Sequence, residues 1–291
     1  MAKEDLVASL KNKQKVTIEN NDEMQQELFV MKDAEYNKTF DKFSINFKHS
    51  DVEDYLKSLN VSIHLVVTSP PYNCNIKYDV HEDNMDWNEY ESWLTKVFEL
   101  TNNKMVEGGR IILNFPIFVK SASGRKSLIP IFEKIISNAG FEIFDYIDWI
   151  KAKDEKEAIG VAGRSTAWGS WLSPSSPNVR PISELIMVAK KPGKFISIND
   201  EVTISTEEFK ASTISAWFIQ GSSSKYHPAT FPPEIACRAI NLYSYKYDNI
   251  FDPFMGIGST AVACLTTNRS FYGCDISKKY IQRAAARISG V

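Results

Sequence analysis

The chain has few cysteines, no excess of charge of one sign and no long apolar run. Its 291 residues include four cysteines without C-x-x-C spacing, which predicts free thiols in a reducing compartment rather than a disulfide framework or a zinc site. Lys and Arg total 34 against 36 Asp and Glu, so any contact with nucleic acid must use local basic patches. No apolar run reaches about 18 residues and residues 1–14 are polar, so neither secretion nor membrane spanning is expected.

Buried strands and amphipathic helices alternate along the chain. Residues 63–67 form a continuous apolar run rich in β-branched side chains, which is typical of a strand buried on both faces of a parallel sheet. Further strands are predicted at 43–47, 110–115, 141–150, 182–189, 249–252 and 270–275, and helices at 51–59, 87–105, 128–138, 232–244, 259–267 and 278–288. Gly108 and Gly109 are expected to end the second of these helices. This alternation predicts an α/β fold with a parallel sheet.

Three stretches depart from that alternation. Residues 1–40 are polar throughout and predict a peripheral, partly helical arm. Residues 151–180 are basic and rich in Gly, Ser and Pro, which predicts an irregular insertion between strands. Residues 190–224 are polar again.

A glycine-containing turn follows the strand at 249–252. The turn reads Asp252-Pro253-Phe254-Met255-Gly256-Ile257-Gly258-Ser259-Thr260 and leads into a helix. Glycine lets the backbone approach a ligand, and a helix N-terminus offers unpaired N–H groups. The third glycine of the dinucleotide fingerprint is missing, but Asp275 ends the next strand, where an acid can hold a ribose diol. Together these features favour a nucleoside cofactor over an ordinary strand–helix turn.

A second turn, Thr68-Ser69-Pro70-Pro71-Tyr72-Asn73, ends the buried strand at 63–67. Its two prolines stiffen the backbone, so the Ser69 hydroxyl and the Pro70 carbonyl are held with little loss of entropy. Two acceptors side by side can receive both N–H bonds of an amino group, and the Tyr72 ring can stack. A plain proline loop is the alternative. The position after a buried strand, where α/β sheets bind ligands, favours a site.

These motifs resemble those of a known family. Residues 69–72 are similar to the catalytic motif of the amino-methylating DNA methyltransferases, and residues 252–260 are similar to their cofactor motif. His227-Pro228-Ala229-Thr230-Phe231-Pro232-Pro233 resembles the family's segment just before the cofactor motif. The order of the motifs is similar to that of the β group, and Ser-Pro-Pro-Tyr is similar to its cytosine-N4 type. The matches span 42–120 and 181–285.

The resemblance implies a doubly wound, mostly parallel, seven-stranded methyltransferase sheet. Residues 41–150 and 181–291 would form this catalytic domain, and 151–180, with 195–225 as a candidate extension, would read the target sequence. The implied cofactor is S-adenosyl-L-methionine. Asp51 lies where the family often has Gly-Asp near the cofactor, but Ser50 replaces that glycine, and a helix cap is an equal alternative for Asp51. The residues implied to bind the cofactor are Asp252, Pro253, Phe254, Gly256, Gly258, Ser259, Thr260, Asp275, Asp51, His227 and Pro228.

The implied reaction is methylation of an exocyclic amino group of a base flipped out of double-stranded DNA. Ser69, Pro70, Pro71 and Tyr72 would be catalytic, no metal is expected, and Lys151, Lys153, Arg164 and Arg180 would contact DNA. The predicted acceptor is cytosine N4, with adenine N6 as the alternative. More distant alternatives are an RNA or protein-amide methyltransferase and a catalytically silent DNA-binding subunit. A cognate restriction endonuclease is the implied partner, in a prokaryotic cytoplasm.

Several residues have simpler interpretations that we favour. His227 precedes a proline in a loop and is expected to shape the cofactor pocket rather than act as a base. Cys74 is expected to pack rather than attack a base, because covalent chemistry needs an activated thiolate. Trp168 and Trp171 are expected to fill a small lobe rather than stack on bases.

Overall fold

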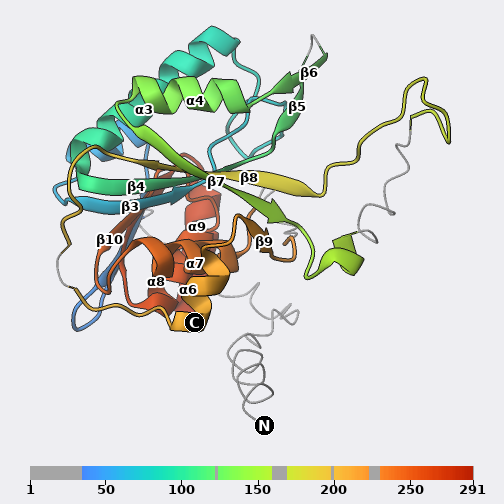
Figure 1. Ribbon diagram of the computed structural model, residues 1–291. Helices are drawn as coiled ribbons and strands as arrows, with labels where there is room; N and C mark the ends of the chain where they lie inside the picture. The colour runs from blue at the N-terminus through green and yellow to red at the C-terminus, as the bar shows by residue number, and fades with distance from the viewer. Residues whose placement is uncertain (1–34, 122–123, 159–168, 198–199, 223–229, 291) are drawn as a thin grey trace.

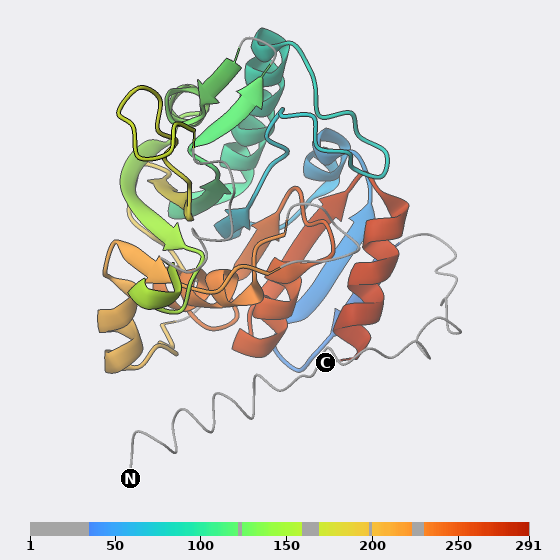
Figure 2. The ribbon, with the colours of Figure 1, turned by 90° about the vertical axis from the view of Figure 1, so that its right-hand side faces the viewer.

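A β-sheet forms the centre of the protein in the computed structural model, which describes residues 35–121, 124–158, 169–197, 200–222 and 230–290 (Figure 1). The sheet's strands are β1 (Glu35–Thr39), β2 (Ser44–His49), β3 (Ile63–Thr68), β4 (Met105–Phe115), β7 (Glu142–Ile150), β8 (Ser183–Lys190), β9 (Ala216–Phe218), β10 (Asn249–Asp252) and β11 (Ser270–Asp275). Within the described ranges these nine strands lie in the order β1-β2-β11-β10-β3-β4-β8-β7-β9. Figure 2 shows β2, in blue, beside the red strands from the end of the chain.

Most neighbouring strands of the sheet are parallel. The run β2-β11-β10-β3-β4 is parallel throughout, whereas β8 is antiparallel to both β4 and β7, and β1 is antiparallel to β2. The predicted α/β fold with a mostly parallel sheet is confirmed. The predicted strand number was too low, because β1 and β9 extend the seven central strands at the two edges.

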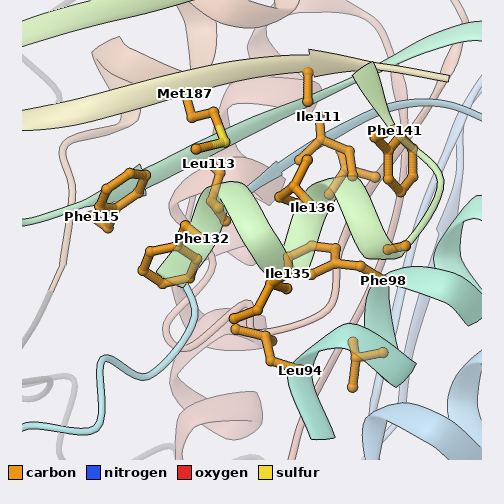
Figure 3. Close-up of a cluster of buried hydrophobic side chains, with 14 of the residues drawn as sticks. Leu94, Phe98, Ile111, Leu113, Phe115, Phe132, Ile135, Ile136, Phe141 and Met187 are labelled. Carbon is orange, nitrogen blue, oxygen red and sulfur yellow. The ribbon is translucent and has the colours of Figure 1, made fainter. Parts of the chain in front are cut away.

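Helices cover both faces of the sheet (Figures 1 and 2). The helices are α2 (Val52–Ser58), α3 (Trp87–Lys104), α4 (Ile129–Asn138), α6 (Thr206–Ser212), α7 (Pro233–Tyr243), α8 (Ser259–Thr267) and α9 (Lys278–Ser289). Side chains of α2, α3 and α4 pack in one hydrophobic core, and those of α7, α8 and α9 pack in a second core on the opposite face. Figure 3 shows the first core, where Phe132 of α4 lies near Leu113 of the sheet and Ile135 of α4 lies near Leu94 of α3. The doubly wound arrangement is therefore confirmed.

Some predicted boundaries were wrong. Gly108 and Gly109 do not end α3; they lie inside β4, which begins directly after the helix. Gly108 has a φ of 68°, and an added Cβ would overlap the backbone of Phe195, so only glycine fits there. Pattern analysis also missed α6 and the hairpin of β5 (Phe118–Ser121) and β6 (Gly124–Ser127), because these elements are short and lack a clear apolar period. Most of the predicted N-terminal arm, residues 1–34, lies outside the described residues.

The sheet has a topological switch point between β3 and β10. The two strands are parallel neighbours, with Phe251 paired to Val66. From β3 the chain continues through α3 to β4 on one side, and from β10 it continues through α8 to β11 on the other. Connections that leave in opposite directions open a crevice at the carboxyl ends of the strands. Both sequence motifs begin at this edge. Across the parts of the chain that the structure describes, no helix has the length and apolar character needed to cross a bilayer.

Candidate functional site

A pocket lies at the carboxyl ends of β3 and β10, and both predicted motifs open into it. The predicted site residues in its lining are Asp51, Ser69, Pro71, Asp252, Pro253, Phe254, Gly256, Ser259 and Asp275. Pro70 and Tyr72 are buried beside the pocket. Gly258 and Thr260 of the glycine turn do not line it, and Thr260 hydrogen-bonds to the carbonyl of Val67. His227, Pro228 and Arg164 lie outside the described residues. The fold therefore brings together two turns that are more than half the chain apart in sequence.

Asp252 joins the two turns. Its carboxylate accepts hydrogen bonds from Thr68 Oγ1 (2.7 Å), Thr260 Oγ1 (2.8 Å) and the backbone N–H of Phe254 (3.1 Å). Burial raises the pKa of Asp252 to about 6, although these three donors oppose the shift. Because Thr68 immediately precedes Ser69, Asp252 fixes the proline turn, residues 68–73, relative to the glycine turn, residues 252–260. The sequence analysis assigned Asp252 to the cofactor alone and missed this hydrogen-bonded link between the two turns.

Asp275 is held ready to accept further hydrogen bonds. Its Oδ2 accepts from the N–H of Gly256 (2.9 Å) and its Oδ1 from the N–H of Ser277 (2.8 Å). Each carboxylate oxygen keeps a lone pair, and the residue lines the pocket. Burial raises the pKa of Asp275 to about 6, and the two backbone bonds oppose the shift. A carboxylate fixed in this way fits two adjacent hydroxyl groups.

The two glycines of the turn have different roles. Gly256 (φ 49°) directs its N–H to Asp275, whereas Gly258 (φ 81°) is the left-handed N-cap of α8. A Cβ on Gly258 would lie 3.2 Å from the Cβ of Ala284. Gly258 therefore permits close packing of the turn against α9, while Gly256 shapes the wall of the pocket.

In the proline turn, the Ser69 hydroxyl is hydrogen-bonded to the Tyr72 hydroxyl. The Tyr72 ring is only 6% exposed and packs in the first hydrophobic core. Stacking of this ring on a base, which the sequence suggested, would require the ring to leave that position. Burial raises the pKa of the Tyr72 phenol, so the hydroxyl keeps its proton. The turn is anchored further by Tyr90, whose hydroxyl donates to the carbonyl of Pro71 (2.7 Å).

The loop after the proline turn is organised by Asp83, which the sequence analysis missed. The buried carboxylate of Asp83 accepts the N–H groups of Asn73 (2.7 Å), Cys74 (2.9 Å) and Ile76 (3.2 Å). Its carbonyl also accepts the N–H of Asn75 (2.7 Å). One acid therefore sets the path of the loop. The only signal in the sequence is an Asp in a polar loop, which is too common to be diagnostic.

The same loop forms one wall of the pocket. The residues that line it from this loop include Tyr78, Asp79 and His81. Asp79 accepts a hydrogen bond from Oγ of Ser277, which follows Asp275 in the chain (2.7 Å). Trp93 of α3 and Phe254 meet at the pocket, with ring centroids 5.8 Å apart. These rings give the pocket flat apolar surfaces next to the Asp275 carboxylate. Their positions depend on the loop and were not identified in the sequence.

The structure can be compared with the simpler interpretations of Asp51, as a helix cap, and of Cys74, as a packing residue. Asp51 caps α2, because its Oδ1 accepts the N–H of Glu53 (2.8 Å), and it also lines the pocket. Its contact with a cofactor stays a prediction. Cys74 packs against the first core, and burial raises the pKa of its thiol to about 12. The thiol is therefore protonated at neutral pH, as its assignment to packing requires.

The predicted DNA-contacting residues are spread over the insertion. Lys151 pairs with Glu184, while Lys153 is exposed and Arg180 is partly buried. Trp168 lies outside the described residues. Trp171 is 64% exposed, so its expected burial in a small lobe was wrong. Contact of these residues with DNA stays a prediction.

Comparison with known proteins identifies relatives of the chain. The N6/N4 family model described as DNA methylase matches residues 63–286. The type II methyltransferase M.MjaVI of Methanocaldococcus jannaschii is 34% identical over 167 residues, which cover 57% of this chain and 81% of that protein.

Two solved structures share the fold. TTHA0409 of Thermus thermophilus, in complex with S-adenosyl-L-methionine, is 24% identical, with a TM-score of 0.64, and the match covers 84% of this chain and 92% of that one. The PvuII DNA methyltransferase (cytosine-N4-specific) is 19% identical, with a TM-score of 0.62, and the match covers 84% and 86%.

Proposed function

The chain belongs to the N6/N4 DNA methylase family, and from this premise we propose that it transfers a methyl group from S-adenosylmethionine to cytosine N4 in double-stranded DNA. The observation that carries the proposal is the shared pocket, into which Ser69 of one turn and Asp275 of the other both open. One turn offers acceptors for an amino group, and the other offers a carboxylate for a nucleoside. We propose that the enzyme acts at a specific DNA site alongside a cognate restriction endonuclease.

The residues that line the pocket fit S-adenosylmethionine. The Asp275 carboxylate, held by two backbone N–H groups, would accept the ribose hydroxyls. The apolar rings of Trp93 and Phe254 would flank the adenine, and Asp51 would lie at the pocket's rim. The cofactor supplies a methyl group that is already activated by its positive sulfur. The protein's task is therefore mainly to orient the acceptor.

Ser69 and Pro70 would orient the target nitrogen. The lone pair of an exocyclic amino group is conjugated with the ring, which makes the nitrogen a poor nucleophile. Two acceptors, the Ser69 hydroxyl and the Pro70 carbonyl, would receive its two N–H bonds and stabilise the positive charge that develops during transfer. The base must leave the duplex to reach them, at a cost of a few kcal/mol.

Ser69 also favours cytosine over adenine. The sequence Ser-Pro-Pro-Tyr resembles the cytosine-N4 type, whereas an acid at this position is more typical of adenine methylation. An acid would make a bond about twice as strong as that of a hydroxyl, but either group can accept an N–H bond. The size of the base pocket must therefore contribute to the choice.

Nucleoside analysis tests the acceptor. DNA methylated by the purified protein is digested to nucleosides and analysed by mass spectrometry, and we expect N4-methylcytosine. N6-methyladenine as the sole product would mean that the acceptor is adenine N6, and the roles proposed for the catalytic residues would stand. C5-methylcytosine would contradict the mechanism, because that reaction needs a thiolate nucleophile.

We further propose that residues 151–180 read the target sequence, with 195–225 as an extension. Because β7 is antiparallel to β8, and β8 to β4, β7 ends at the same edge of the sheet as β3 and β10. The insertion therefore leaves the sheet at the same edge as the pocket, three strands away from β3. Its apolar residues Trp171, Leu172 and Val179 have exposed fractions of 64%, 88% and 84%, so they are available for contact with a partner.

Replacing 153–180 with a short linker should abolish site preference and leave affinity for S-adenosylmethionine unchanged. This replacement keeps Lys151 and the buried Ala152 in place. Methylome sequencing reads the site, and calorimetry reads cofactor affinity. Methylation of the same site by the shortened protein would mean that another segment reads the sequence.

A further inference from the structure

A chain of hydrogen bonds leads from Ser69 through the sheet to the start of the insertion. Ser69 contacts the Tyr72 hydroxyl, and Tyr72 contacts Asn114 of β4. Asn114 Nδ2 donates to Glu184 Oε2 of β8 (2.7 Å). Glu184 Oε1 accepts from Nζ of Lys151, the first residue after β7. Asn114 is 4% exposed and the Glu184 side chain 16%, so the chain is largely shielded from water.

The Tyr72 hydroxyl joins Ser69 to Asn114. It lies 3.4 Å from the backbone carbonyl of Asn114 and 3.5 Å from Asn114 Nδ2, and it makes a short contact with the Ser69 hydroxyl. Because Nδ2 only donates, it must use a lone pair of the Tyr72 oxygen. Either hydroxyl can donate in the bond between Tyr72 and Ser69, and in both cases the Ser69 oxygen keeps a lone pair for the target amino group.

Glu184 fixes the orientation of the Asn114 amide. A carboxylate only accepts, so it turns the Asn114 NH2 group toward itself, and the second N–H of that group faces Tyr72. Asn114 Oδ1 is buried and has no hydrogen-bond partner among the described residues. The side chain's only short hydrogen bond within the described ranges is the one to Glu184, so Glu184 sets its orientation.

We propose that Glu184 is a positioning residue for methyl transfer, which acts through Asn114 and Tyr72 to hold Ser69 as a hydrogen-bond acceptor. The proposal rests on the proposed function, in which Ser69 receives an N–H bond of the target base. It holds for cytosine or adenine, because both present an amino group. It also gives Lys151 a role inside the protein, since Lys151 occupies the second oxygen of Glu184 at the start of the insertion.

The nearly isosteric substitution Glu184→Gln tests the proposal. Glutamine has one carbonyl oxygen, and Lys151, which only donates, will attract it. The glutamine NH2 group will then face Asn114 and turn its amide, so that Oδ1 faces Tyr72. The Tyr72 oxygen loses a donor, so the Tyr72 hydroxyl holds Ser69 less firmly. We expect the single-turnover rate of methyl transfer to fall about tenfold, the effect of roughly one hydrogen bond, with unchanged affinity for S-adenosylmethionine.

Two further combinations separate positioning from general damage. In a Tyr72→Phe background, Glu184→Gln should change the rate by less than about twofold, because the link to Ser69 is already cut. Adding Lys151→Met to Glu184→Gln should restore the rate to that of Lys151→Met alone, because the glutamine oxygen can then turn to Asn114. Glu142→Gln, which removes the acid of an exposed ion pair with Lys190 at the other end of β7, is the matched control and should have no effect. Additive rate losses in the Tyr72→Phe background, or no recovery with Lys151→Met, would overturn the proposal.

A measurement without turnover separates this proposal from the proposed function. The side-chain NH2 resonances of Asn114, assigned by Asn114→Asp in 15N-labelled full-length protein, should shift in Glu184→Gln and not in Glu142→Gln. Unchanged resonances would overturn the role of Glu184 even if DNA is methylated. If the resonances shift but the wild-type protein methylates neither cytosine nor adenine, the proposed function fails and the positioning of Asn114 by Glu184 stands.

Discussion

Ser69→Ala should slow methyl transfer by about 10²–10³-fold and leave the affinity for S-adenosylmethionine nearly unchanged. The Ser69 hydroxyl would be one of the two acceptors for the target amino group, and its bond to Tyr72 holds it in place. A group that acts chiefly in the transition state lowers the rate without weakening ground-state binding. Single-turnover kinetics on methylatable DNA measure the rate, and calorimetry measures the affinity.

Two variants serve as references for Ser69→Ala. Tyr72→Phe removes the partner of Ser69 but not its oxygen, so its rate loss should be smaller. Ser62→Ala, at an exposed residue just before the other end of β3, should leave the rate unchanged. If Ser69→Ala weakens cofactor binding as much as it slows transfer, Ser69 belongs to the cofactor site and its role as acceptor is wrong.

Asp275→Ala should weaken binding of S-adenosylmethionine by about 10- to 150-fold, which corresponds to the roughly 1.5–3 kcal/mol of hydrogen bonds to a charged group. The Asp275 carboxylate would hold the ribose hydroxyls and already organises the N–H groups of Gly256 and Ser277. Direct titration by calorimetry measures the loss. Asp54→Ala, which removes an exposed acid of α2, is the control. Unchanged affinity in Asp275→Ala would refute the ribose contact.

The raised pKa of Asp275 adds a pH dependence to this prediction. Hydroxyl donors favour the ionised carboxylate, and the pKa of Asp275 before binding is about 6. As pH falls below about 6, the carboxylate takes up a proton that binding must displace, so affinity should fall by up to about tenfold per pH unit. The Asp275→Ala variant should lose this component, although Asp252, with a pKa also near 6, can retain a part of the slope. An identical pH profile in both proteins would contradict the assignment.

Local patterns in the sequence determined the alternation of strands and helices. The apolar run of β3 and the strand–turn–helix of β10 and α8 were predicted almost to the residue. Both depend on nearest neighbours: β-branched side chains favour strands, and prolines or glycines end them. The two turns could also be placed at one edge of the sheet, because parallel strands meet at their carboxyl ends.

Long-range pairing decided what the sequence could not. Edge strand β1 has no clear apolar pattern and β9 has only three residues, and each pairs with a free edge that β2 or β7 presents. Asn114 and Glu184 are 70 residues apart and are single polar positions in buried strands. Their contact depends on the antiparallel register of β4 and β8, in which Asn114 faces Ile186.

The residues of the site also fall into those predicted from local sequence and those whose roles depend on tertiary contacts. Sequence alone predicted roles for Ser69 and Asp275, because rigid turns and strand ends are local features. Only the tertiary structure assigned Asp252 to joining the turns, Asp83 to the loop and Glu184 to the chain behind Ser69. A polar side chain acquires such a role from the burial and partners that folding gives it, since the same residue on a solvated surface would pair with water.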